Sequence, residues 1–162
     1  MEGEEILRVE NLVKRFGDFT ALNGVSLAIR GDGVTAIIGP NGAGKTTLIN
    51  VITGRLKLDS GRIFFMGRDI TGASPHKIVR LGIARTFQII NLFRSLSVYQ
   101  NVLISSLSKK GSDVDIDGII KRLGLNGYRD TEVYKLPHGL QRLVEIAVAL
   151  ATKPRLLLLA KC

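Results

Sequence analysis

The residues with the clearest chemical potential lie in the stretch GPNGAGKT, residues 39–46. It matches the pattern G-x-x-x-x-G-K-[ST] at every fixed position. Gly42 and Gly44 let the backbone curl so that its N–H groups point inward, and a helix that begins next adds partial positive charge at its N-terminus. We therefore predict a cradle for phosphate groups rather than a glycine-rich turn without a ligand.

The spacing also predicts a role for the side chains that follow the glycines. Lys45 should reach the β- and γ-phosphates, the Thr46 hydroxyl should ligate Mg²⁺, and Thr47 should donate to the α-phosphate. The expected cofactors are therefore ATP and Mg²⁺. The predicted nucleotide-binding loop comprises Gly39, Pro40, Asn41, Gly42, Ala43, Gly44, Lys45, Thr46 and Thr47.

The elements around this loop follow from apolar patterning. Residues 33–39, GVTAIIG, form a continuous apolar run, which predicts a strand buried on both faces. Residues 45–54 predict a helix closed by Gly54. Residues 6–30 predict antiparallel strands, and residues 60–67 predict another strand.

The second half of the sequence is mostly helical in pattern. Residues 74–82 predict a helix with Ser74 as N-cap, and residues 97–108 and 113–123 predict two more. In residues 140–152, Leu143, Ile146, Ala147 and Leu150 recur at helical spacing, which predicts the strongest helix of the chain. The leucines of residues 155–159 predict a parallel strand. The fold class is therefore α/β, a core with a helical insertion.

Composition limits the alternatives. The chain has 162 residues, 45% of them hydrophobic, and a formal net charge of +9. Its basic residues are scattered, which favours a solvated basic surface, and no nucleic acid partner is expected. No apolar run approaches the roughly 20 residues that span a bilayer. The N-terminus does not resemble a signal peptide, and the single cysteine, Cys162, fits a reducing cytosol.

Several stretches beyond the loop resemble the nucleotide-binding domain of ABC transporters, over residues 5–159. They are VKRFGDFTALNGVSLAI near the N-terminus, ARTFQ at residues 84–88, and LPHGLQRLVEIAVALATKPRLLLL at residues 136–159. The resemblance implies that Phe16 stacks on adenine; the alternative is an aromatic residue that fills the core. It also implies that Gln88 reaches the metal or the attacking water and couples the site to membrane subunits.

The segment LPHGLQ resembles the family's signature motif, which closes over ATP held by the opposite subunit. Its residues are Leu136, Pro137, His138, Gly139, Leu140 and Gln141. Leu140 stands where the family has glutamine, while Gly139 is retained and still permits close approach of phosphate. His138 stands where related sequences often carry tyrosine, and it is either a polar contact or a residue of a surface loop.

The resemblance extends to a subgroup that serves branched-chain amino acid uptake, which shares stretches such as NVITG, DSGRIFF and LGIARTFQ. It implies a P-loop NTPase core with an N-terminal antiparallel β subdomain. Residues 1–91 would form that β subdomain plus the core, 92–152 a helical subdomain and 153–162 a strand that returns to the core. The implied partners are transmembrane permease subunits and a second ATPase subunit, identical or paralogous, at the cytoplasmic face of the membrane.

The end of the chain departs from the family. Ala160 and Lys161 stand where the resemblance places an aspartate that helps to hold Mg²⁺ and a glutamate that polarises the attacking water. Neither side chain can replace a carboxylate there. We therefore expect an incomplete domain that lacks its C-terminal part, exposes apolar sheet edges and hydrolyses ATP poorly. The alternatives are a non-hydrolysing regulatory or assembly module, and a soluble ATPase of another process.

Overall fold

The computed structural model describes residues 4–31, 33–86, 92–107 and 113–159. The chain divides into two compact units, Met1–Leu81 and Gly82–Cys162. Each unit is described by itself below. Within the described residues, no helix is both long and apolar enough to cross a membrane.

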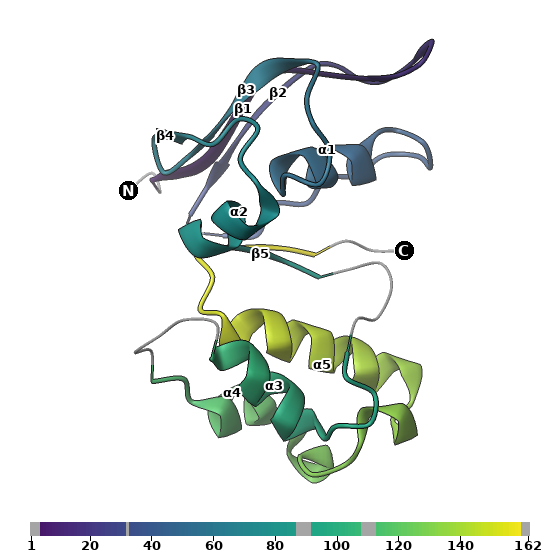
Figure 1. Ribbon diagram of the computed structural model, residues 1–162, viewed down its shortest axis with the longest axis vertical. Coiled ribbons are helices and arrows are strands. Elements are labelled where there is room, and N and C mark those ends of the chain that lie inside the picture. The colour runs from purple at the N-terminus through teal and green to yellow at the C-terminus, as the bar shows by residue number, and fades with distance from the viewer. Residues whose placement is uncertain (1–3, 32, 87–91, 108–112, 160–162) are drawn as a thin grey trace. The chain divides into compact units, whose positions relative to one another are not determined.

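The first unit is built on an antiparallel sheet with the strand order β2-β1-β3-β4 (Figure 1). The strands are β1 (Glu5–Phe16), β2 (Phe19–Arg30), β3 (Ser60–Phe65) and β4 (Arg68–Asp69). The buried side chains of β1 and β3 are Leu7, Val9, Leu12, Ile63 and Phe65, and the register of β1 shifts between Val9 and Leu12. Leu7 pairs with Phe65 and Val9 with Ile63 across the two strands. The predicted antiparallel strands are confirmed.

Two helices complete the first unit, α1 (Lys45–Ile52) and α2 (Pro75–Leu81). The Ser74 hydroxyl accepts a hydrogen bond from the Lys77 N–H at 3.5 Å, so the predicted N-cap is confirmed. Gly54 follows α1 with φ 70°, and a side chain there would meet the Ala73 carbonyl oxygen at 2.3 Å. Only glycine fits this helix end, as the sequence pattern indicated.

The segment that leads into the nucleotide-binding loop differs from its prediction. Residues 34–39 form no strand in the structure. Val34 is fully exposed and Ile38 is 92% exposed, so the expectation of a doubly buried strand is wrong. A parallel strand is buried where other elements cover both faces of its sheet, and this segment joins no sheet among the described residues.

The second unit contains a small parallel sheet of two strands, β5 (Ile83–Arg85) and β6 (Leu156–Leu158). The leucine run therefore forms a parallel strand, as predicted, but its side chains are half-buried rather than buried. Strand β5 was not predicted. It is three residues long and lies within the ARTFQ region, where no alternation of apolar and polar residues is long enough to indicate a strand.

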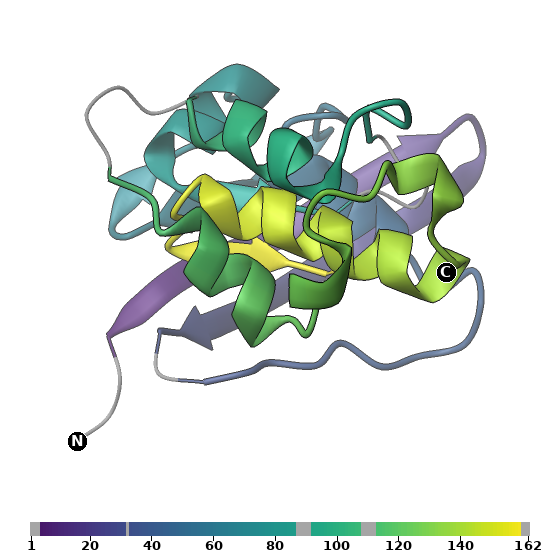
Figure 2. The same ribbon diagram turned by 90° about the horizontal axis from the view of Figure 1, so that it is seen from below.

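Three helices form the core of the second unit: α3 (Val98–Ser106), α4 (Ile116–Arg122) and α5 (His138–Ala151). Short 3-10 turns, η1 (Asn126–Tyr128) and η2 (Val133–Lys135), connect α4 to α5. Figure 2 shows the three helices gathered together. Ser97 and Gln100 form a capping box at the start of α3, and the Asp115 carboxylate caps α4. The predicted helices are confirmed.

The buried face of α5 matches the apolar spacing only in part, since Ala147 is buried in the helical core and Leu143 packs against it. The residues of α5 buried in the helical core are Val144, Ala147 and Ala151. Ile146 and Leu150, which share that spacing, are only half-buried and lie outside that core. Because α5 is apolar on more than one side, its periodicity alone does not select a face. The packing of α3 and α4 makes that selection.

Candidate nucleotide-binding site

The glycine-rich loop keeps the geometry that its sequence requires. Gly42 has φ 84° and Gly44 has φ 81°, both in the left-handed region that favours glycine. The Ala43 N–H donates to the Pro40 carbonyl at 3.3 Å, which closes a turn, and the Leu48 N–H donates to Gly44 at 2.8 Å. The chain therefore turns sharply at residues 40–44 and enters α1 directly.

Lys45 folds back along this loop. Its Nζ donates to the carbonyl oxygens of Gly39 and Pro40, each at 2.6 Å. An ammonium group has three N–H donors, and two of them hold the lysine against the loop here. The positive charge therefore lies beside the turn, where an incoming phosphate could replace the two carbonyls.

The loop rests on strand β2. A Cβ added at Gly44 would lie 2.4 Å from the Ala21 carbonyl oxygen and 3.1 Å from Leu22 Cδ2. This close approach leaves no room for a side chain at residue 44. The first turn of α1 carries no acidic residue, so the partial positive charge at the helix start is not neutralised there.

The remaining threonines and the aromatic candidate belong to the same unit. Thr46 is exposed and Thr47 is half-buried in the first turn of α1. Phe16 ends β1, pairs with Phe19 across the hairpin and is 47% exposed. Lys14 Nζ lies 5.4 Å from the centre of its ring. Phe16 therefore does not fill the core, and its ring is accessible to a ligand.

A carboxylate secures the end of β1 near Phe16. The Asp59 side chain accepts hydrogen bonds from the Arg15 N–H at 2.5 Å and from Lys14 Nζ at 3.1 Å. These donors, the backbone N–H first, hold the pKa of Asp59 below its usual value. The charged form of Asp59 thus stabilises the hairpin that carries Phe16.

Three sequence-predicted residues, Gln88, Ala160 and Lys161, lie outside the described residues. The chain is described up to Thr86, whose N–H donates to the Leu158 carbonyl at 3.0 Å. Because β5 and β6 are parallel, their C-terminal ends lie at the same edge of this small sheet.

The predicted signature segment lies at the start of α5 in the second unit. Pro137, His138 and Gly139 are exposed, Leu140 is half-buried, and Leu136 and Gln141 are buried. No side chain caps this helix start, and its first turn has no acidic residue. Of the six predicted residues, only Pro137–Gly139 are therefore fully open to a ligand.

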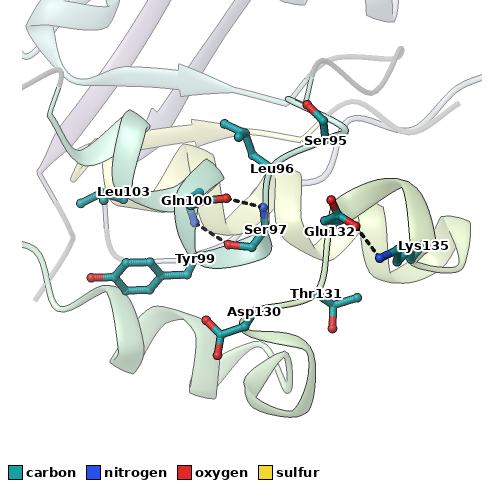
Figure 3. A pocket seen from close by; sticks show the side chains of 10 residues that line it. All are labelled: Ser95, Leu96, Ser97, Tyr99, Gln100, Leu103, Asp130, Thr131, Glu132 and Lys135. Atoms are coloured by element: carbon teal, nitrogen blue, oxygen red, sulfur yellow. Dashed lines mark hydrogen bonds and ion pairs between the residues drawn. The ribbon is translucent and has the colours of Figure 1, made fainter.

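The second unit also carries an open groove of about 1080 Å³. Figure 3 shows its lining: Ser95, Leu96, Ser97, Tyr99, Gln100, Leu103, Asp130, Thr131, Glu132 and Lys135. Asp130 accepts from Arg129 Nη1 at 2.8 Å, and Glu132 pairs with Lys135, whose ammonium group lowers the pKa of Glu132. Because these charges are already paired, the groove lacks the converging donors of a phosphate site.

Comparison with known proteins identifies the family of this chain. The family model described as ABC transporter matches residues 22–160. A probable branched-chain amino acid transport ATP-binding protein, LivG, of Methanocaldococcus jannaschii is 40% identical, over 96% of this chain and 67% of its own length. A high-affinity branched-chain amino acid transport ATP-binding protein, also LivG, of Salmonella typhimurium is 34% identical, over 96% and 69%.

Solved structures of ATP-binding cassettes are also similar to this chain. MJ1267, an ATP-binding cassette of an ABC transporter, has a TM-score of 0.83 and 42% identity, covering 95% of this chain and 68% of its own. A dimeric ATP-binding cassette, MJ0796, in a post-hydrolysis state bound to ADP and Pi, has a TM-score of 0.80 and 25% identity, covering 95% and 73%. The chain spans about two thirds of the length of the curated relatives it matches. It belongs to the ATP-binding subunits of the ABC transporter family, whose core is a P-loop NTPase fold.

Proposed function

We propose that this chain binds Mg²⁺-ATP in the loop of residues 39–47, as the ATP-binding subunit of an importer for branched-chain amino acids. The observation that carries the proposal is the loop itself. Two left-handed glycines lead into an uncapped helix start, and Lys45 lies along the turn. The names of the relatives, which describe branched-chain amino acid transport, support the substrate class.

The chain's own residues fit the nucleotide. Backbone N–H groups at residues 42–46 and Lys45 Nζ would bind the β- and γ-phosphates, since both supply positive potential at one helix start. Thr46 would provide a hydroxyl ligand to Mg²⁺, and Gln88 a second oxygen. The metal ion neutralises phosphate charge and polarises the phosphoryl oxygens when bound. The exposed ring of Phe16 would stack on the adenine.

Hydrolysis should be weak in the chain as it stands. Ala160 and Lys161 occupy the positions at which the family resemblance places the two carboxylates. Without a carboxylate to orient and polarise water, the chemical step loses general-base assistance, which contributes roughly 10²–10⁴-fold. These two residues also favour the second candidate function, a regulatory or assembly module that holds nucleotide without hydrolysing it.

The proposed partners follow from the exposed signature segment. Pro137, His138 and Gly139 would meet the nucleotide held by a second ATPase subunit, where the uncapped start of α5 faces phosphate. Transmembrane permease subunits would then hold the pair at the cytoplasmic face of the membrane. The dimeric relative with ADP and Pi supports the pairing of two ATPase subunits.

A nucleotide-binding assay with a matched lysine control tests the proposal. Lys45→Met should weaken binding of a fluorescent ATP analogue by about 10–100-fold, because a charge-assisted contact to phosphate is lost. Lys57→Met removes an exposed lysine of the same unit and should leave the affinity within about twofold. Equal affinity of wild type and Lys45→Met would refute the assignment of the loop.

A further inference from the structure

The buried side chain of Gln141 has a contact that the sequence motif does not reveal. Gln141 is 9% exposed and Leu136 is 5% exposed. The Gln141 Nε2 donates to the Leu136 carbonyl oxygen at 2.8 Å. The glutamine therefore points into the second unit, away from the exposed residues of the signature segment.

This contact supports the turn that presents those residues. Leu136 (ψ 143°) and Pro137 (φ −55°, ψ 150°) are both extended, so the Leu136 carbonyl cannot join the hydrogen-bond ladder of α5. The Leu136 N–H is held by the Val133 carbonyl at 3.1 Å. With Gln141 on the carbonyl, both polar groups of the Leu136 backbone are satisfied, as buried backbone groups require.

Gln141 also links the turn to the first turn of the helix. Its own N–H and that of Leu140 donate to the Pro137 carbonyl at 3.1 and 2.9 Å. One residue thus contacts the turn twice, through the backbone at Pro137 and through the side chain at Leu136. Because Pro137 has no N–H and no side-chain cap is present, the contacts made by Gln141 help to fix the direction in which residues 137–139 leave the turn.

We propose that Gln141 is a positioning residue, which orients Pro137–Gly139 for phosphate and does not contact the nucleotide itself. The assignment of phosphate to this segment rests on the proposed function. The orientation of the turn by Gln141 rests only on the contacts above. The two parts can therefore be tested separately.

Hydrogen–deuterium exchange tests the positioning role without a ligand. Gln141→Leu keeps the volume but removes the donor, so exchange of the Leu136 and Leu140 amides, which donate to the Val133 and Pro137 carbonyls, should rise by about tenfold or more as the turn opens locally. The matched control is Gln100→Leu, which removes the acceptor for the Ser97 N–H in the α3 capping box. It should speed exchange at the start of α3 and leave residues 138–140 unchanged. Unchanged exchange of the Leu136 and Leu140 amides in a folded Gln141→Leu protein would overturn the proposal.

A second variant keeps the test decisive if Gln141→Leu does not fold. In Gln141→Glu, a protonated carboxyl can donate to the Leu136 carbonyl, while a carboxylate can only accept. At pH 8, far above the ordinary glutamate pKa of about 4.3, the carboxylate cannot donate, so protection of the Leu136 and Leu140 amides should fall by about tenfold relative to wild type. Wild-type protection in Gln141→Glu at pH 8 would overturn the positioning role.

Nucleotide-dependent association then addresses the link to phosphate. With Mg²⁺-ATP, Gln141→Leu should weaken self-association by about tenfold while its affinity for a fluorescent ATP analogue stays at the wild-type value. Association as strong as wild type, with the turn shown to be open, would overturn the link to phosphate. Failure of the wild-type chain to bind the analogue would instead contradict the proposed function, and the exchange result would still decide the role of Gln141.

Discussion

The two helix starts assigned to nucleotide, at α1 and at α5, both contain a glycine, but for different physical reasons. Gly44 has φ 81°, and a Cβ there would lie 2.4 Å from the Ala21 carbonyl oxygen. Gly139 does not have a positive φ, and a Cβ there would meet no atom within 4 Å. Gly44 is thus required by the fold of the loop. Gly139 leaves open space at the surface, as close approach of a ligand would require.

The side chains that hold the two starts differ as well. At α1 a charged lysine donates to two loop carbonyls from an accessible position. At α5 a neutral, buried glutamine donates to one carbonyl from inside the unit. Lys45 can give up the two loop carbonyls and bind phosphate instead. The buried Gln141 can only orient the residues next to it. A motif match therefore does not by itself separate ligand residues from positioning residues.

The largest expected effect is at Gly44. Gly44→Ala should lower the free energy of unfolding by at least about 3 kcal/mol, from backbone strain plus the clash with Ala21. Binding of a fluorescent ATP analogue should also be lost. Gly42→Ala is the control, since Gly42 has a similar φ but open space around its Cα, and it should cost only about 1–2 kcal/mol. If urea unfolding gave the same loss of free energy of unfolding for both variants, the contact of residue 44 with β2 would not contribute to stability.

An opposite effect on stability is expected at Gly139. Gly139→Ala should raise the free energy of unfolding by about 0.5–1 kcal/mol, because alanine favours a helix and meets no obstacle there. Self-association in Mg²⁺-ATP should nevertheless weaken, as the added methyl group occupies the proposed phosphate approach. Thermal unfolding and sedimentation measure the two effects. A stabilised variant that associates like wild type would contradict the reason given for this glycine.

The smallest effect concerns the carboxylate of Asp59, which secures the end of β1 near Phe16. The pKa of Asp59 is lowered below its usual value in the folded chain. Its contribution to stability is therefore complete above the usual pKa, near 3.8, and is lost as pH falls through the lower folded value. Asp59→Asn should reduce the slope of stability against pH below about pH 4, because Asp59 no longer titrates. A slope in Asp59→Asn equal to that of wild type would contradict this role of the carboxylate.

The sequence predicted those parts that depend on local rules. The loop at residues 39–46, the Ser74 cap and the glycine at residue 54 follow from backbone geometry, and the structure has them as expected. The helices and antiparallel strands follow from apolar periodicity. The exposure of Ile38 does not follow, because burial of a strand depends on neighbours that its own residues do not specify.

The candidate site also contains residues that local spacing predicts and residues whose role depends on packing. Lys45 and the glycines could be assigned from spacing, because their chemistry is set by a single loop. The hydrogen bond of Gln141 to the turn could not be assigned from spacing. The spacing of three residues from Val144 indicates only that Gln141 lies on the core side of α5. Strand β5 and the true buried face of α5 depend on which elements pack together, which a single sequence does not specify.

The central claim is that the loop of residues 39–47 binds Mg²⁺-ATP, and hydrogen–deuterium exchange with and without nucleotide tests it most directly. Saturating Mg²⁺-ATP should slow exchange at residues 42–48 by about tenfold or more, whereas AMP should have little effect because it lacks the β- and γ-phosphates. Protection confined to the groove at residues 95–103 and 130–135, or equal protection by AMP, would contradict the account.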